Sequence, residues 1–244
     1  PCIDQQLIFY NASLRDFSGY LEFEPWISYL WEMDRAKVSC QLVDEQGIQL
    51  PFQKIKAEAA FHLLRMLTHL KIPAGSQRIL RIKHDCEPVF ESHIKISDNT
   101  MSNKNLNLCL GDPGLESILF KDQQILTGPI QAQIYQDDTD TWSHGVDRYN
   151  TDPIGKFSSS SAWTIEEKGP LLASLVKHMN FEQSKLDYEI RINADEDIIR
   201  IKLRINWNDR LKVVKLVIPS GITSGTRLDG CPGGQIGREI NGQE

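Results

Sequence analysis

Alternation is unbroken in the stretch Ile199-Arg200-Ile201-Lys202-Leu203-Arg204-Ile205-Asn206-Trp207, where every odd position is apolar and every even position is polar. A β-strand turns successive side chains to opposite faces, so this pattern predicts a strand with one buried face and one solvated face. The preceding stretch 186–192 alternates in the same way, and the polar residues 193–197 have the length and composition of a hairpin turn. The two stretches therefore predict an antiparallel hairpin.

The β pattern extends outward from this hairpin over most of the chain. The pattern does not decide between helix and strand in two stretches, the first half of 55–70 and residues 169–176. Residues 137–161 and the glycine-rich tail after Ile218 are interpreted as loops, because they are rich in turn-forming residues. Further strands are predicted at Tyr20–Glu24, Met66–Ile72, Arg78–Lys83 and Lys212–Ile218.

Many short strands separated by turns predict an all-β fold built from antiparallel β-sandwiches. The polar, turn-rich stretch 97–105 is the best candidate for a boundary, or else for a long hairpin loop. We therefore expect a small β-sandwich domain over residues 1–96, a linker over 97–105, and a larger β-sandwich domain over 106–244.

The overall composition excludes several classes of protein. The chain is 40% hydrophobic and 25% charged, with a formal net charge of −6. The proportions are close to those of average globular proteins, which argues against disordered, collagen-like and coiled-coil chains. The negative charge disfavours nucleic acid or an anionic membrane as a partner, because both attract basic surfaces. No apolar run has the length of a membrane span.

Cysteine usage points to a reducing compartment. None of the five cysteines forms a CxxC pair, so a zinc ribbon or a thioredoxin-type motif is not predicted. An odd and sparse set of thiols favours a cytoplasmic location. The chain begins at Pro1 rather than at a methionine, and we expect it to be a segment of a longer protein.

No stretch has the spacing of a known catalytic or metal-binding motif. The histidines form no HExxH pair, and no GxSxG marks a serine nucleophile. The acidic run 137–140 lacks the glycine that a calcium-binding loop requires. We therefore predict no catalytic residue and no metal ligand within this chain.

One loop segment, residues 140–149, is rich in groups that bind sugars. Aromatic rings stack on sugar rings, while charged and polar side chains on a loop pair with hydroxyl groups. The alternative is a surface loop whose Trp142 plugs the core beneath it, and the sequence does not separate the two. The candidate substrate-binding residues are Asp140, Trp142, His144, Arg148 and Tyr149.

The same segment belongs to a series of short motifs with a recognisable order. The series resembles, in order and spacing, the C-terminal β-rich region of glycoside hydrolase family 38, the α-mannosidases. The resemblance covers nearly the whole chain, although none of its motifs is catalytic. In chain order the motifs are Ile8–Ser13, Leu42–Gly47, Leu70–Gly75, Asp140–Tyr149, Glu167–Ala173, Asn206–Arg210 with Leu216–Pro219, and Gly237–Glu244.

The resemblance implies a part of a larger enzyme. Members of the family carry an α/β barrel-like domain and a helical bundle, followed by β-domains that end in a large galactose-mutarotase-like sandwich. Their nucleophilic aspartate and their histidine–aspartate–aspartate–histidine zinc site precede the β-domains. The chain would begin after these groups and stop short of the family's final strands. The zinc would then be bound outside the chain, and the larger sandwich would be truncated at its C-terminus.

The function that the resemblance implies is α-mannoside hydrolysis by the parent protein. The parent would retain configuration by double displacement, and this region, itself inactive, would pack on the N-terminal catalytic domain and complete it. The expected partners are that domain and a carbohydrate substrate, with no nucleic acid and no membrane. One alternative is an independent carbohydrate-binding module. A mutarotase-like sugar epimerase is the weaker alternative, because no His–Glu pair on strand positions supplies its acid and base.

Overall fold

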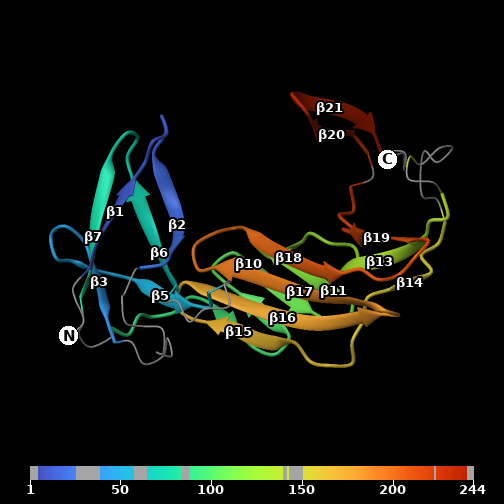
Figure 1. Cartoon of the computed structure of the whole chain (residues 1–244), viewed down its shortest axis with the longest axis horizontal. Helices are drawn as coiled ribbons and strands as arrows, with labels where there is room; N and C mark the ends of the chain where they lie inside the picture. Colours follow the sequence, from blue (N-terminus) through green and yellow to red (C-terminus); the bar gives the residue numbers. More distant parts are fainter. Residues whose placement is uncertain are drawn as a thin grey trace. The chain divides into compact units, whose positions relative to one another are not determined.

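The structure is a computed structural model that describes residues 5–25, 39–57, 65–83, 88–139, 142, 151–222 and 224–240. Over these residues all regular structure is β-strand, in several antiparallel sheets (Figure 1). The all-β fold class predicted from the alternating pattern is therefore confirmed. Within the same residues, no helix is long and apolar enough to cross a membrane.

The chain forms two compact units, each assembled from separate segments. The first unit contains residues 1–95, 166–174 and 192–198, and the second contains residues 96–165, 175–191 and 199–244. Strands β16 (Leu172–Phe181) and β17 (Ser184–Asn193) therefore contribute one end to the first unit and the rest to the second. The domain ranges inferred from the sequence remain a prediction.

The first unit is a small β-sandwich. Leu42 and Leu80 of one sheet share a buried apolar cluster with Met66 and Leu70 of the other, so the two sheets enclose one core. The sheets have the orders β1-β7-β3-β4 and β2-β6-β5, with β1 at Gln5–Tyr10, β2 at Phe17–Phe23, β3 at Gln41–Val43, β4 at Gln49–Leu50, β5 at Phe52–Ile55, β6 at Arg65–Ile72 and β7 at Gln77–Lys83.

The second unit contains an 8-stranded and a 4-stranded sheet. The larger sheet has the order β14-β13-β11-β10-β9-β8, with β12 added beside β11 and β19 beside β13, and the smaller has the order β15-β16-β17-β18. Their remaining bounds are β8 Lys95–Ile96, β9 Thr100–Ser102, β10 Leu106–Leu110, β11 Gly114–Phe120, β12 Gln123–Gln124, β13 Ile130–Gln136, β14 Gly155–Lys156, β15 Thr164–Lys168, β18 Ile199–Asn206 and β19 Lys212–Val217.

Tyr188 joins the two sheets of this unit. Its side chain is fully buried, and its hydroxyl donates a hydrogen bond to the Ile130 carbonyl at 3.2 Å. The ring lies against Gly114, where an added Cβ would approach the Ile130 oxygen to 2.2 Å at a φ of +147°. Only glycine fits this crossing, since any side chain would collide with backbone. The second unit is thus also a sandwich of antiparallel sheets.

Strand β18, which has the most regular alternation in the sequence, lies at the edge of its sheet. β18 pairs with β17 as predicted, at the end of its sheet. Its apolar positions are nonetheless only half-buried, and Ile205 is 39% exposed, whereas Leu186 and Ile190 of β17 are 0% exposed. An edge strand has a neighbour on one side only, so alternation predicts which face turns inward but not how deeply it is buried.

Stretches interpreted as linker or loop also contain strands. The expected linker 97–105 includes β9, which pairs with β10, and the Ser97 amide donates to the Thr100 carbonyl at 2.9 Å in the turn before it. The tail expected to be loop forms a hairpin of β20 (Thr226–Cys231) and β21 (Gly234–Glu239). Pro232 followed by Gly233, at a φ of +83°, is typical of a type II turn and connects them.

The stretches left open between helix and strand are only partly strand, since Ile55 ends β5, while residues 56–57 and 169–171 have no regular structure. Residues 172–176 begin β16, and β6 covers the second half of the stretch 55–70. The residues 58–64 between β5 and β6 lie outside the described part of the chain.

Candidate functional site

The predicted sugar-binding segment is described at one position. Trp142 lies in a turn with its side chain 81% exposed. This exposure contradicts the interpretation of Trp142 as a plug in the core. Asp140, His144, Arg148 and Tyr149 lie outside the described residues. Their part in a sugar site stays a prediction.

The connection that carries Trp142 begins and ends on a well-paired strand. It leaves β13 at Gln136 and returns through β14, where the Ile154 amide donates to the Ile134 carbonyl at 2.8 Å. On the other side of β13 lies β19, and the Asp137 amide donates to the Leu211 carbonyl at 3.0 Å. The start of the connection therefore lies directly beside the turn between β18 and β19.

Two turns at this end of the second unit are joined by a buried polar network. The Ser184 hydroxyl, at the start of β17, donates to the Asp209 carboxylate at 2.6 Å and accepts from the Asn208 amide at 2.8 Å. The hydrogen bond from Ser184 holds the pKa of Asp209 below its usual value, so this carboxyl stays charged. The network fixes the turn 206–211 against the turn 181–184.

Aromatic rings support these turns from below. Phe157 is fully buried, with Phe181 at 6.2 Å and Trp207 at 6.4 Å between ring centroids. Gly155 lies flat against the Phe181 ring, where an added Cβ would come within 2.5 Å. The same end of the unit also carries an ion pair between Lys212 and Glu182 at 2.9 Å.

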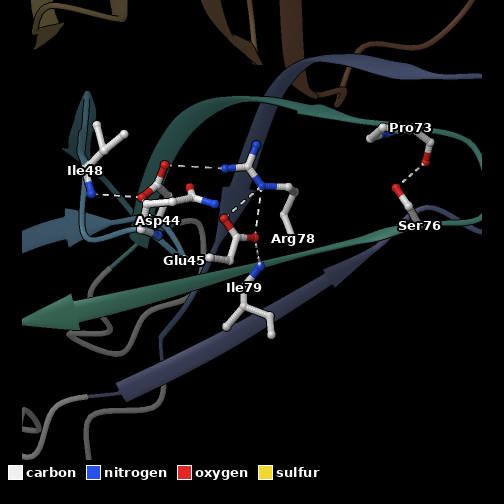
Figure 2. Close-up of polar contacts among 8 residues, drawn as sticks. Asp44, Glu45, Ile48, Pro73, Ser76, Arg78 and Ile79 are labelled. Atoms are coloured by element: carbon white, nitrogen blue, oxygen red, sulfur yellow. Dashed lines mark hydrogen bonds and ion pairs between the residues drawn. The ribbon is translucent and has the colours of Figure 1, made fainter.

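In the first unit, polar residues of the motifs that resemble glycoside hydrolase family 38 form hydrogen bonds that close and connect turns. The Asp44 carboxylate accepts hydrogen bonds from the amides of Gln46 at 3.0 Å and Ile48 at 2.8 Å, which closes the turn after β3 (Figure 2). The Asn11 amide group donates to the carbonyls of Arg15 at 2.8 Å and Ile72 at 2.9 Å, and so joins two further turns. These polar groups maintain the fold.

Glu45 ties the same turn to β7. Figure 2 shows the Arg78 guanidinium beside it, with Nε 3.0 Å from a Glu45 oxygen that also accepts from the Ile79 amide at 2.6 Å. The hydrogen bond from Arg78 lowers the pKa of Glu45 to about 2, although burial alone would raise it. In return, Glu45 raises the pKa of Arg78.

A buried glutamine in β5 binds the segment that enters the first unit from residue 166 onward. The Gln53 side-chain oxygen accepts from the amides of Leu171 at 3.1 Å and Leu172 at 2.8 Å, and its nitrogen donates to the Leu172 carbonyl at 3.1 Å. The side-chain amide thus takes the place of a neighbouring strand. Gly169 leaves room for it, because an added Cβ would lie 2.1 Å from the Gln53 amide carbon.

The second unit contains one buried lysine among the described residues. Lys177 is 4% exposed, and its ammonium lies 3.1 Å from Asp112 and 5.9 Å from the Trp163 ring centre. Burial alone would raise the pKa of Asp112, but hydrogen bonds from the Ser159 amide and from Lys177 lower it below the usual value. The lysine is accounted for as one half of an ion pair.

Among the described residues, no group of three or more His, Cys, Asp or Glu side chains could hold a metal ion. Cys40 is buried, Cys109 is half-buried and Cys231 is exposed, all as free thiols. His178 pairs with Asp187 at 2.7 Å, and both side chains are largely exposed. This part of the chain therefore presents no assembled catalytic constellation. The predicted absence of catalytic residues and metal ligands stays a prediction for the whole chain.

Residues 101–244, more than half of the chain, match the model of the glycosyl hydrolases family 38 C-terminal domain. The chain belongs to this family. No curated protein matches its sequence.

Solved structures agree with the family 38 assignment in fold. An alpha-mannosidase from Enterococcus faecalis V583 superposes with a TM-score of 0.74 and 12% identity, covering 99% of this chain and 34% of that one. A protein in the glycosyl hydrolase family 38 from Enterococcus faecalis superposes with a TM-score of 0.72 and 12% identity. This match covers 98% of this chain and 35% of that one. The chain thus spans about a third of the length of these proteins, and the likeness shows the fold alone.

The turn 206–211 is not among the candidate sites predicted from the sequence, where the motif Asn206–Arg210 contributes only to the family resemblance. A signal was available, since a strand pattern that ends in Trp, Asn, Asp and Arg places aromatic and charged groups in a turn, where binding residues are common. What the sequence did not reveal is that β-sheet pairing brings this turn beside the connection that carries Trp142.

Proposed function

We propose that this chain is the non-catalytic β-region of a retaining α-mannosidase and that it packs on the enzyme's catalytic domain and completes it. The observation that carries this proposal is the family 38 C-terminal match over residues 101–244. The share of the solved proteins that the chain spans, 34%, supports a role as one region of a larger enzyme. The alpha-mannosidase among those structures supports α-mannosides as the substrate class in this proposal.

Retaining hydrolysis needs two carboxyl groups about 5–5.5 Å apart, one as nucleophile and one as acid and base. The buried carboxylates described in this chain have other tasks. Asp44 closes a turn, Glu167 accepts from the Lys56 amide, and Asp209 accepts from Ser184. Glu189 pairs with Arg191 at 3.4 Å. In our proposal the nucleophile and the acid/base therefore belong to the catalytic domain.

The zinc implied by the family resemblance finds no fitting ligand set in the described residues, so we assign no step of the reaction to it here. In our proposal the metal is bound by the catalytic domain of a cytoplasmic enzyme. This chain contributes the loop that carries Trp142, which excludes water and offers an aromatic face to the sugar.

An independent carbohydrate-binding module is the second candidate. The 81% exposure of Trp142 favours it, since an open aromatic face is a feature of sugar-binding surfaces. The two candidates differ in what the isolated chain does. A module binds mannooligosaccharides tightly by itself, whereas an enzyme region requires its catalytic domain.

Turnover of an aryl α-mannoside with added zinc tests the proposal. The chain 1–244 alone is expected to show no hydrolysis and to lose zinc on dialysis, while the longer polypeptide that contains it hydrolyses the substrate. Metal analysis after dialysis accompanies the assay. Hydrolysis by residues 1–244, abolished by replacing a carboxylate within them, would overturn the proposal.

A further inference from the structure

At one end of the second unit, three connections meet through strand pairing. The connection carrying Trp142 starts at Asp137, whose amide binds the Leu211 carbonyl at 3.0 Å. The turn 206–211 is in turn bound to the turn 181–184, where the Asn208 side chain donates to the Gln183 carbonyl at 3.3 Å. We use the name turn-end surface for Trp142 together with five exposed residues of the two turns, namely Glu182, Asn206, Asn208, Arg210 and Leu211.

Trp142 is within reach of the turn 206–211. It follows Asp137 by five residues, and a fully extended chain advances at most about 3.3–3.6 Å per residue. The backbone of Trp142 therefore lies no more than roughly 18 Å from the hydrogen bond between Asp137 and Leu211. An oligosaccharide of a few units is long enough to contact both places.

The turn holds its exposed side chains on a rigid base. Asp209 is 8% exposed and its carboxylate is hydrogen-bonded by Ser184. Trp207, in the same turn as Asp209, packs against the ring of Phe157. Arg210 lies next to Asp209, so its backbone is set by a buried network. A binding group on such a base loses less conformational entropy when a ligand binds than one on a loose loop.

Two of the four described residues that have a side chain and a left-handed φ lie at this end, and the other two, Lys121 and Asp122, form the turn between β11 and β12. Leu211 has a φ of +55° and Glu182 a φ of +43°, in the left-handed region that residues with a side chain normally avoid. Leu211 is also 63% exposed, so core packing does not explain a leucine at this position. Strained residues that persist without a packing role cluster at binding sites.

The exposed groups suit a neutral sugar better than an anion. Arg210 offers a planar fork of N–H donors. The Asn208 side-chain nitrogen donates to the Gln183 carbonyl and to the Asn206 side-chain oxygen at 3.2 Å, so the Asn206 nitrogen is left as the donor and the Asn208 oxygen as the acceptor for adjacent hydroxyl groups. The other charges nearby are balanced, since Lys212 pairs with Glu182 at 2.9 Å. A phosphate-binding surface would instead carry a surplus of positive charge.

We propose that the turn-end surface binds a sugar unit of an extended α-mannoside, with Arg210 and Asn208 contacting hydroxyl groups and Trp142 stacking on a neighbouring ring. The inference rests on the proposed function and adds to it a preference for oligosaccharides. Both Trp142 and Arg210 are exposed, whereas a pocket for a single sugar encloses most of its ligand. The surface therefore suits an extension of the substrate beyond the bond that is cleaved.

The test compares Arg210→Ala with Arg204→Ala in the full-length protein. Both arginines are exposed, and Arg204 lies on β18 outside the turn. For an α-mannotriose, Arg210→Ala is expected to raise KM about tenfold with little change in kcat, because it removes charge-assisted hydrogen bonds to the substrate. The loss is expected to be smaller for an aryl α-mannoside, and thermal stability should match that of Arg204→Ala.

Equal kinetics for the two arginine variants on mannotriose, or an equal loss on both substrates, would overturn the inference. Titration of mannotriose, followed by tryptophan fluorescence, separates this outcome from failure of the proposed function. A protein that hydrolyses no mannoside but binds mannotriose, about tenfold more weakly after Arg210→Ala, contradicts the enzyme assignment and supports the surface.

Discussion

The polar residues of the two units are used in opposite ways. In the first unit, Asn11, Asp44 and Gln53 are buried, and each bonds to backbone groups. Asn11 and Gln53 bond to a segment distant in sequence, and Asp44 bonds within its own turn. At the turn end of the second unit, Asn208 and Arg210 are exposed on a turn whose stability comes from Ser184 and Asp209 beneath it. Asn11 and Asp44 in the first unit, and Asn208 and Arg210 in the second, belong to motifs that resemble the same family.

The difference separates residues that the fold explains from residues that it does not. A buried amide whose hydrogen bonds all go to backbone is fully accounted for by stability, because leaving those groups unpaired is costly. An exposed arginine on a rigid turn contributes little to stability. Variants in the first unit should therefore change unfolding, and variants at the turn end should change substrate binding.

The largest expected effect is that of Gln53→Met. It leaves the amides of Leu171 and Leu172 without their acceptor. Each buried group left unpaired costs about 1–3 kcal/mol, so we expect a loss of about 3–5 kcal/mol. The melting temperature should fall by roughly 10 °C in thermal denaturation.

Gln49→Ala serves as the matched control for Gln53→Met. Gln49 is exposed on β4, and its loss should cost less than about 0.5 kcal/mol. If the Gln53→Met and Gln49→Ala proteins have the same melting temperature, the stability of the first unit does not depend on the buried hydrogen bonds of Gln53.

At the turn end, Trp142→Ala should weaken substrate binding without lowering stability. Losing the stacking face and its exclusion of water should cost about 1–3 kcal/mol of transition-state binding, or roughly 5- to 150-fold in kcat/KM for a mannooligosaccharide. Steady-state kinetics of the full-length protein measure this loss. Unchanged kinetics with a lowered melting temperature would move Trp142 into the class of fold-maintaining residues.

Glu45→Gln tests the charged link of the first unit through its pH dependence. At pH 7 the variant should lose about 1–2 kcal/mol of stability, since its hydrogen bonds to Arg78 and Ile79 are no longer charge-assisted. The pKa of Glu45 is lowered from 4.5 to about 2 in the folded protein, so the unfolded chain takes up the proton first. The advantage of the wild type is complete above pH 4.5 and disappears as the pH falls towards 2.

Urea unfolding at several pH values measures the difference between the wild type and Glu45→Gln. Glu91→Gln, which changes an exposed carboxylate, is the control and should show no such window. A stability difference that stays constant from neutral to acid pH would exclude the charge of Glu45 as its source.

The smallest effect expected is a gain in stability from Leu211→Gly. Glycine adopts a φ of +55° without steric cost, so the unfolding free energy should rise by up to about 1 kcal/mol. Leu216→Gly, on the paired strand β19, should instead destabilise the protein by a similar amount. If both variants lose stability equally, the leucine side chain at position 211 supports the fold and the contrast between the two regions weakens.

The sequence predicted strands well because periodicity is a local property. Alternation in 199–207 and 186–192 was enough to predict β18, β17 and their pairing, since each residue's face is set by its neighbours along the chain. Depth of burial was not predictable, because the half-exposure of Ile205 depends on β18 lying at an edge.

The candidate site was predicted only in part, for the same physical reason. The aromatic segment 140–149 is visible as composition, and Trp142 is exposed as a ligand-binding ring requires. Arg210 is 68 residues beyond Trp142 in the chain, and the pairing of β13 with β19 brings its turn beside Asp137, where the connection that carries Trp142 begins. Long-range pairing of this kind leaves no trace in a single sequence.

The segmented build of the first unit has a consequence for how such genes can recombine. Gln53 binds residues 171 and 172, so the unit depends on a stretch encoded far downstream of residue 95. An exchange between related genes near residue 96 would join β5 to a foreign version of that stretch and mismatch the side-chain amide with its backbone partner. A crossover after residue 198 leaves all segments of the first unit from the same parent gene. Chimeras joined there should therefore retain a folded first unit more often than those joined at the apparent boundary.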